Sequence, residues 1–409
     1  MRLKNTFIKT LREAPKDELA KNGALLTRAG YIHKEMAGAY DYLPLGLRVI
    51  ENIKNIIREE LNALGCEEVL MTALQNPEPW EKTGRFSDQE VDIWFKTNLA
   101  SGGELGLAPT HEEPMVNMLK TYISSYKDLP IYIYQFLTKF RNELRAKSGI
   151  MRGREFLMKD LYSFHASSAD LDEFYEKVEG AYTRIFDRLG IGDCTYKTFA
   201  SGGIFSKYSH EYQTVLDVGE DTIYCNKDRS LVFNKEVFND EVLAEFGAKR
   251  DEFEEMHGVE TGNIFKLNFK YSEPLGLKFS DEENRLQTVY MGCYGMGVSR
   301  LMGVIAEKFA DEKGLVWPKS IAPFSVYLIG IGEKGVAAAE KFYAEHSDKI
   351  LFDDRDVRPG EKFADAELMG MPCRVVISDK TLDKGVAEVV ERASGETREI
   401  SIDKLGDLL

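Results

Sequence analysis

The sequence predicts an α+β fold, in which an antiparallel sheet flanked by helices is followed by a small α/β domain. Two observations lead to this prediction. Aromatic and β-branched residues fill 131–144, and apolar residues alternate over 154–165, which favours two antiparallel strands joined by a basic loop. After residue 323, three short β-rich segments alternate with two helical segments, a pattern typical of an α/β domain with a parallel core.

The first predicted elements are a long helix and a strand. Apolar residues recur at helical spacing over 44–64, Pro44 suits the first turn and Gly65 the end. A strand is expected over 67–72. A second long helix is predicted over 168–189, with Ser168 as its N-cap.

The middle of the chain predicts further elements with less regular patterns. The acidic segment 234–258 is expected to be helical in pieces. A strand over 287–292 precedes a helix over 297–309, and a linker is expected at 317–323. The small domain over 324–409 is expected to contain strands at 324–331, 350–353 and 373–378, helices at 333–345 and 359–369, and an antiparallel pair at 386–390 and 397–402.

Length and composition indicate a globular protein of two or three domains. The chain has 409 residues, of which 43% are hydrophobic. No apolar run approaches the ~20 residues that cross a bilayer, and residues 1–18 lack the apolar stretch of a signal peptide. We therefore expect a soluble, cytoplasmic protein.

Cysteine spacing and charge limit the possible ligands. The five cysteines are scattered without a Cys-x-x-Cys pair, so neither a zinc site nor a disulfide frame is predicted. The net charge of −15 argues against broad nonspecific binding of nucleic acid. Nevertheless the segment 139–154 is basic. It contains one acid, Glu143, and six cations: Lys139, Arg141, Arg145, Lys147, Arg152 and Arg154. This segment is either a docking place for a polyanion or a solvated loop.

Two segments carry residues suited to a nucleotide phosphate. Arg141 on a sheet face can hold a carboxylate or phosphate with two hydrogen bonds, and Glu143 can accept from an adenine amino group. Arg154 can reach the distal phosphates, and Phe156 offers a ring for stacking. In the second segment, the glycines of 292–297 allow close backbone approach, and Arg300 lies at a helix start that favours phosphate.

These segments resemble the motifs of class II aminoacyl-tRNA synthetases. Phe140-Arg141-Asn142-Glu143 through Phe156 resembles motif 2, residues 295–300 resemble motif 3, and the helix at Pro44 with its following strand resembles motif 1, the usual dimer interface. Further segments resemble the bacterial-type prolyl-tRNA synthetase family: 108–112, 154–164, 209–211, 291–295, 353–355 and 358–360.

The resemblance implies ATP-dependent attachment of L-proline to tRNA(Pro) through a prolyl-adenylate, with Arg141 and Arg300 as catalytic residues. It implies a proline site made of Thr110, Glu112, Arg141, Met158, Asp160, Tyr162, His210 and Cys293. It also implies an ATP site made of Arg141, Glu143, Arg152, Arg154, Phe156, Gln287, Thr288 and Arg300, with Mg²⁺ bridging phosphates and no metal cage built from protein alone.

The resemblance also implies a domain plan. A catalytic domain is expected over 1–316, with motif 1 near 38–72, motif 2 near 131–165 and motif 3 near 287–310, followed by an anticodon-binding domain over 324–409. The segment 221–286 is too short for the editing insertion that relatives commonly carry. The anticodon contacts are expected from Asp354, Arg355, Arg358, Lys362 and Phe363, although a helix-capping salt-bridge cluster is an equal alternative.

Two other functions remain open at this level. Another class IIa synthetase, such as a threonyl enzyme, would need a polar pocket and often zinc. A synthetase-derived binding protein without catalysis typically loses motif arginines, yet Arg141, Arg154 and Arg300 are present. The expected partners are L-proline, tRNA(Pro) and a second copy of the chain, with no membrane.

Overall fold

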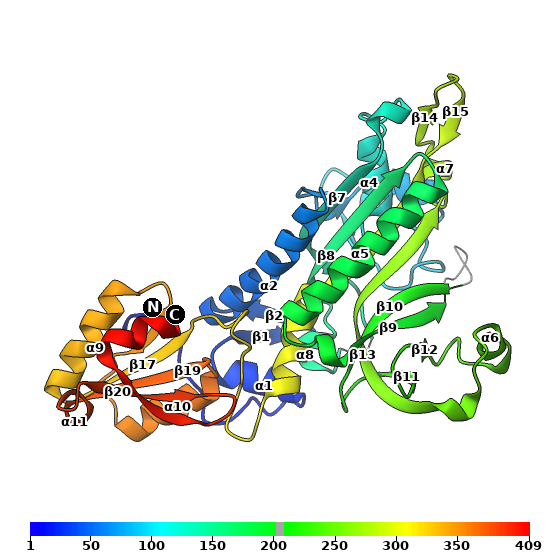
Figure 1. Cartoon of the computed structure of the whole chain (residues 1–409). Helices are drawn as coiled ribbons and strands as arrows, with labels where there is room; N and C mark the ends of the chain where they lie inside the picture. The colour runs from blue at the N-terminus through cyan, green and yellow to red at the C-terminus, as the bar shows by residue number, and fades with distance from the viewer. Residues whose placement is uncertain (145, 202–207) are drawn as a thin grey trace. The chain divides into compact units, whose positions relative to one another are not determined.

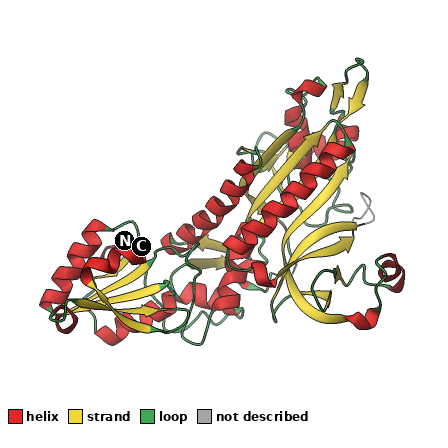
Figure 2. Ribbon diagram, viewed as in Figure 1, coloured by secondary structure: helices red, strands yellow, loops and turns green. Residues whose placement is uncertain are grey.

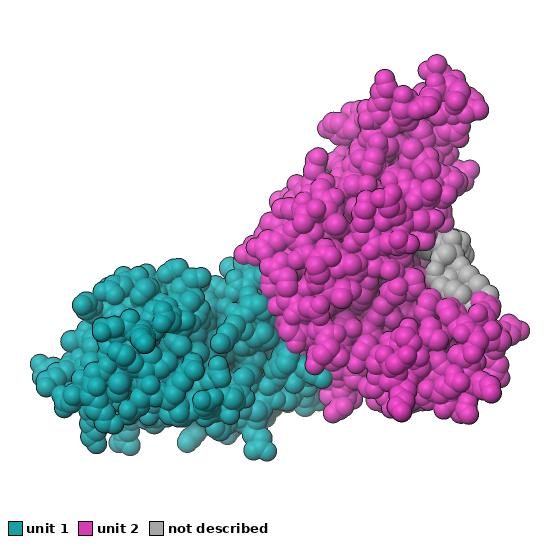
Figure 3. All heavy atoms as spheres, in the orientation of Figure 1, with its two compact units in different colours: residues 1–53, 147–151, 305–409 teal, residues 54–146, 152–304 magenta. Residues whose placement is uncertain are grey.

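The computed structural model describes residues 1–144, 146–201 and 208–409 (Figure 1, Figure 2). Two compact units divide the chain (Figure 3): one comprises 1–53, 147–151 and 305–409, and the other 54–146 and 152–304. Arg145, part of the expected basic loop, lies outside the described residues. No helix of the described residues is long and apolar enough to span a membrane.

A nine-stranded sheet dominates unit 2 within the described part of the chain, in the order β10-β9-β12-β11-β13-β16-β8-β7-β3. Most neighbours are antiparallel; β3 with β7 and β12 with β9 are parallel. The strands are β3 (Glu67–Glu68), β7 (Ile131–Phe140), β8 (Glu155–His165), β9 (Thr195–Ser201), β10 (Tyr208–Val215), β11 (Asp221–Asn226), β12 (Val232–Asn234), β13 (Phe253–Asn268) and β16 (Tyr290–Gly297).

Helix α5 (Ser168–Arg188) covers one face of this sheet (Figure 1). Its Phe174 and Tyr175 rings contact Tyr294 of β16. The carboxylate of Glu60 in α2 (Pro44–Ala63) accepts from Arg184 and Arg188 of α5, so these helices lie side by side. Because side chains alternate across a strand, Cys293 and Gly295 face away from α5.

Smaller elements surround the sheet. A three-stranded sheet, a hairpin and short helices complete unit 2: β4 (Leu74–Gln75), α3 (Pro77–Lys82), β5 (Phe95–Asn98), β6 (Glu104–Leu107), α4 (Glu112–Leu119), α6 (Asp240–Glu245), α7 (Ser272–Leu275), β14 (Lys278–Ser280) and β15 (Leu286–Thr288). Helix α8 (Val298–Phe309) follows β16 directly.

In unit 1, a five-stranded sheet has the order β18-β17-β19-β20-β21. Its first three strands are parallel and its last two antiparallel, as the sequence predicted. The elements are α1 (Lys21–Arg28), β1 (Ile32–Met36), β2 (Ala39–Tyr42), β17 (Val326–Ile331), α9 (Glu333–Glu345), β18 (Ile350–Asp353), α10 (Pro359–Met369), β19 (Cys373–Ser378), α11 (Asp379–Leu382), β20 (Val386–Glu391) and β21 (Thr397–Ser401).

The expected class of fold is confirmed, but several elements differ. The acidic segment 234–258, expected to be helical in pieces, contains α6 and a 3-10 turn at Arg250–Glu252, but its end is extended, since the long strand β13 begins at Phe253 and pairs with β10, β11 and β16. At this end, strand pairing overrides local helix preference, while Glu254 and Glu255 at the start of β13 are exposed to water.

Other differences concern element ends. The strand expected over 131–144 ends at Phe140, since the Asn142 N–H donates to Ile93 rather than to β8. The strand expected over 67–72 pairs only at 67–68. The strand expected over 287–292 is two strands, β15 and β16, and the N-cap of α5 is Ser167 rather than Ser168.

Candidate active site

Three adjacent strands of unit 2 form the floor of a cavity of about 230 Å³. Across β13, β16 and β8, Phe265 lies opposite Cys293, which lies opposite Tyr162. The next row joins Asn263, Gly295 and Asp160. A Cβ at Gly295 would lie 2.7 Å from the Asn263 side chain, so glycine keeps this row open. Met158 continues the β8 side of the lining.

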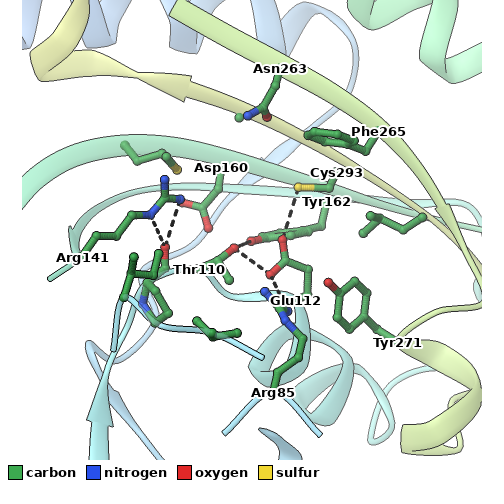
Figure 4. Close-up of a pocket in the computed structure, with 16 residues that line it drawn as sticks. Arg85, Thr110, Glu112, Arg141, Asp160, Tyr162, Asn263, Phe265, Tyr271 and Cys293 are labelled. Atoms are coloured by element: carbon green, nitrogen blue, oxygen red, sulfur yellow. Dashed lines mark hydrogen bonds and ion pairs between the residues drawn. The ribbon is translucent and has the colours of Figure 1, made fainter. Parts of the chain in front are cut away.

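The segment before α4 supplies a network of acceptors on one wall (Figure 4). The Thr110 hydroxyl donates to Glu112 Oε2 at 2.7 Å. The Tyr162 hydroxyl lies 3.3 Å from Thr110 Oγ1 and accepts from the His111 N–H at 3.0 Å. The Cys293 thiol donates to Glu112 Oε1 at 3.5 Å. Thr110 and Cys293 therefore both donate to the Glu112 carboxylate, and Tyr162 extends the network through Thr110.

Arg85, a residue that the sequence analysis did not identify, keeps the Glu112 carboxylate ionised. Its Nη1 lies 2.9 Å from Glu113 and 3.5 Å from Glu112. Burial disfavours the charge on Glu112, yet the Arg85 guanidinium and the Thr110 hydroxyl outweigh it and lower the pKa of Glu112. Burial and the Glu112 charge raise the pKa of Glu113 to about 7. Glu112 is thus the anionic member of the pair.

Asp160 contributes a second carboxylate to the cavity. Its Oδ2 accepts from Lys139 Nζ and from Gln135 Nε2, both at 2.9 Å. Its Oδ1 is buried without a hydrogen-bond partner among the described residues. Since Asp160 lines the cavity, that oxygen is available to a cationic ligand.

Arg141 follows β7 at the rim of the cavity. Its Nε and Nη2 each donate to the Pro109 carbonyl at 3.3 Å, and its guanidinium lies 5.3 Å from the centre of the Phe156 ring. Burial, together with the nearby Arg300 charge, lowers the pKa of Arg141. A guanidinium in this position can bind a carboxylate or phosphate at the cavity mouth.

The remaining predicted phosphate ligands have protein partners. Arg152 donates to Glu143 Oε2 at 3.1 and 3.0 Å and to Glu220 at 2.6 Å. Arg154 donates to the Glu143 carbonyl, and Arg300 lies 3.5 Å from the Glu260 carboxylate. These exposed or half-exposed pairs are weak enough to be exchanged for phosphate.

Besides the nucleotide-binding residues of motifs 2 and 3 other than Arg141, three further predicted site residues do not line the cavity. The His210 ring contacts Phe199 and its Nδ1 lies 2.8 Å from the Tyr175 hydroxyl; burial and the charges of Lys197 and Lys266 lower its pKa to about 4. Gln287 and Thr288 of β15 line a different surface hollow, and the Gln287 amide donates to Asp281.

Several lining residues were missed by sequence reasoning, among them Arg85, Asn263, Phe265 and Tyr271. Asn263 and Phe265 lie on β13, in a region of the chain without a recognisable motif. Their period-two spacing was a usable signal, because both must share one face of a strand. Arg85 and Tyr271 follow no local pattern.

The predicted anticodon residues lie in unit 1. Asp354 and Arg355 directly follow β18, Arg358 is the N-cap of α10, and Lys362 and Phe363 lie within α10. Arg355 donates to Asp353 at 2.8 and 2.7 Å and to Asp365 at 2.7 Å. Asp354, Arg355 and Lys362 line a polar hollow of about 560 Å³. The Phe363 ring lies under Arg374, at 4.9 Å.

Comparison with known proteins identifies the class. Residues 95–309 match the family described as tRNA synthetase class II core domain (G, H, P, S and T), and residues 325–409 match the anticodon binding domain. A crystal structure of prolyl-tRNA synthetase from Cryptosporidium parvum, complexed with L-proline and AMP, has the same fold, with a TM-score of 0.74 at 19% identity; the match covers 93% of this chain and 72% of that one. The sheet and its cavity are thus the core of a class II aminoacyl-tRNA synthetase.

Full-length relatives narrow the class to one family. A proline–tRNA ligase of Agrobacterium fabrum is 36% identical over 98% of both chains, and one of Anaplasma marginale is 36% identical over 99% of both. A proline–tRNA ligase of Bacillus subtilis is 32% identical over 99% of both. The chain belongs to the proline–tRNA ligase family, which confirms the resemblance found in its motifs.

Proposed function

We propose that this chain attaches L-proline to tRNA(Pro) at the expense of ATP, through a prolyl-adenylate. The observation that carries the proposal is the carboxylate of Glu112, which Arg85 and Thr110 keep ionised at the wall of a cavity of about 230 Å³. A buried anion with a hydroxyl beside it suits a secondary ammonium, which presents two N–H groups.

The cavity lining matches the remaining parts of proline. The Asp160 Oδ1 is a further acceptor for the ammonium. Met158, Phe265 and Cys293 supply apolar surface for the ring. Arg141 would hold the proline carboxylate at the cavity mouth. His210 lies outside this lining, so its contact with the ring stays a prediction.

The ATP site would extend from Arg141 over motif 2 and motif 3. Phe156 would stack on the base, Glu143 would accept from the adenine amino group, and Arg152, Arg154 and Arg300 would hold phosphates. For this, Arg152 must exchange its pairing with Glu143 for phosphate. Gln287 and Thr288, which line a different hollow, stay predicted members of the site.

Magnesium would accompany ATP, and Glu211 and Glu260 fit such an ion. Burial, followed by the charge of Glu260, raises the pKa of Glu211 to about 7, because neighbouring carboxylates disfavour each other's charge. When bound, Mg²⁺ neutralises charge on the departing pyrophosphate.

The chain's own residues act by position and charge. Arg141 would align the proline carboxylate with the α-phosphate. A carboxylate oxygen then attacks the α-phosphorus, the bond from the α-phosphorus to the bridging oxygen breaks, and pyrophosphate leaves with the electron pair of that bond. The tRNA 3′-terminal hydroxyl then attacks the prolyl carbonyl and AMP leaves. Both steps need alignment and stabilisation of phosphate charge, and no enzyme nucleophile.

The same proposal includes the absence of an editing site in the chain. Residues 221–286 form short strands, the short helices α6 and α7, and the β13 strand of the main sheet. The alignment with the Bacillus subtilis relative extends over 560 positions, whereas this chain has 409 residues, so that relative carries additional segments.

We further propose that the enzyme is a cytoplasmic homodimer, in which each copy contacts its partner through residues 38–72. Leu47 and Leu70, within that segment, are exposed apolar side chains that a second copy of the chain would cover. In each chain, the linker 317–323 would join the catalytic domain (1–316) to the anticodon-binding domain (324–409). Asp354, Arg355, Arg358, Lys362 and Phe363 would contact the anticodon.

Amino-acid-dependent exchange of pyrophosphate into ATP tests the function without tRNA. Exchange that depends on proline alone supports the proposal. Exchange that depends on another amino acid would identify a different class IIa synthetase, and no exchange with any amino acid would identify a binding protein that has lost catalysis.

A further inference from the structure

The first residues of the chain are attached to the edge of the small sheet in unit 1. Strand β18 is at the edge of that sheet. Arg2 forms a parallel bridge with Phe352, and the Phe352 N–H donates to the Met1 carbonyl at 2.9 Å. Leu3 is buried beside them. The 3-10 turn Leu3–Asn5 therefore has a fixed place beside β18.

This attachment satisfies charges that belong to the small domain. The Arg2 guanidinium donates to Asp354 Oδ2 at 3.1 Å and also pairs with Glu340 of α9. The Lys4 N–H donates to Asp354 Oδ1 at 2.9 Å. Two different N-terminal residues thus occupy both oxygens of Asp354, one of the residues expected at the anticodon.

Lys4 and Asn5 also help to line the polar hollow of about 560 Å³. Its other walls are the carboxyl ends of β17 and β18, with side chains from α9 and α10. Ligands of open α/β sheets bind outside the carboxyl ends of the strands, and the volume is typical of a ligand site. The N-terminal turn therefore completes a hollow at the expected position for a ligand.

The charges around the hollow favour an anionic ligand at its N-terminal rim. Asp353 is paired with Arg355, and Asp354 with Arg2. By contrast, the exposed Lys4 ammonium forms no ion pair with any residue that the structure describes. Glu340, a further acid of the lining, also pairs with Arg2. The exposed Asp356 is the remaining acid of the lining, and a carboxylate can accept from the amino group of a base.

The apolar part of the lining suits a base. Val336, Val357 and Pro359 line the hollow beside these polar groups. A cation at the rim with apolar and polar surface inside is the arrangement that holds an unpaired nucleotide, with its phosphate outside and its base within.

We propose that Lys4 and Asn5 form part of the tRNA-binding surface: Lys4 contacts a phosphate of an unpaired anticodon-loop nucleotide, and Asn5 contacts the base that enters the hollow. The N-terminal turn is then an RNA-reading element of the small domain, although it is far from that domain in sequence. The ligand named here rests on the proposed function, which makes tRNA the substrate.

Aminoacylation at varied tRNA concentration tests this inference in the full chain. Lys4→Ala and Asn5→Ala are compared with the matched control Lys9→Ala. Lys9 is an exposed lysine of the same N-terminal segment that does not line the hollow. Lys4→Ala should raise the KM for tRNA severalfold, and Lys4→Glu should raise it further. The slope of log KM against log salt should become less steep by about 0.7, the value for one phosphate contact on a single strand.

Two measurements locate the effect. Proline-dependent pyrophosphate exchange, which needs no tRNA, should be unchanged in all variants. Binding of an isolated anticodon-arm hairpin should weaken in Lys4→Ala, whereas binding of an acceptor-arm hairpin should not. Equal tRNA KM and salt slope in Lys4→Ala and Lys9→Ala would overturn the inference, while absent proline exchange in the wild type would instead overturn the proposed function.

Discussion

The Lys139 ammonium lies 2.9 Å from the Asp160 carboxylate, and both side chains are buried beneath the active-site cavity. Burial lowers the pKa of Lys139. Because Asp160 also lines the cavity, this ion pair joins the sheet interior to the site where proline is proposed to bind.

Breaking this pair should be costly. Lys139→Met leaves the Asp160 charge buried without its cation, so we expect a loss of about 3–5 kcal/mol in the free energy of unfolding. The double variant Lys139→Met/Asp160→Asn removes both charges and should recover most of the loss. Urea-induced unfolding measures both; equal losses in the single and double variants would contradict a charge-based explanation.

Arg141 is predicted to stabilise charge during adenylate formation. Arg141→Ala should reduce proline-dependent pyrophosphate exchange by about 10²–10³-fold, the effect of losing one preorganised charge-stabilising donor. Arg229→Ala, which removes an arginine outside the cavity lining, is the control. Near-normal turnover in Arg141→Ala would remove this residue from the mechanism.

Glu112 is predicted to bind the proline ammonium. Glu112→Gln keeps the shape of the side chain and removes its charge, so the KM for proline should rise while the KM for ATP changes little. Initial rates of pyrophosphate exchange at varied proline and varied ATP separate the two effects. An unchanged proline KM would exclude the assigned role.

His111 predicts an acid-sensitive stability. Burial and then the Lys139 charge lower its pKa from 6.5 to about 4. Between those two pH values the unfolded chain binds a proton at His111 that the folded chain does not. The titration of His111 therefore leaves the free energy of unfolding unchanged above pH 6.5 and lowers it as the pH falls from 6.5 towards 4. The unfolding free energy of His111→Gln should therefore fall less than that of wild type over this window. Parallel pH profiles would refute the prediction.

Selectivity against smaller amino acids should be limited. An apolar pocket sized for proline rejects a substrate by only about 1–3 kcal/mol per missing methylene. We expect the enzyme to form some alanyl-adenylate, to activate cysteine weakly, and to leave alanyl-tRNA intact. A deacylation assay with purified protein tests this directly, and rapid hydrolysis of alanyl-tRNA would disprove the proposed lack of editing.

Local patterns were sufficient for the periodic elements and for most of the cavity floor. The alternation over 154–165 correctly placed Met158, Asp160 and Tyr162 on one face of β8, because side-chain direction in a strand follows sequence parity. The helices α2 and α5 followed from apolar spacing. The acidic start of β13 did not, since strand pairing on both sides overrode local preference.

By itself the sequence determined the class of fold, the motifs and most of the residues proposed to bind proline, because these depend on local periodicity and on residue chemistry. Only the tertiary structure brought Arg85 to Glu112, joined Lys139 to Asp160 and attached Lys4 to the small domain. Such contacts link residues that no local period relates. They form when chain segments pack together and buried charges must find partners, a condition set by the whole fold.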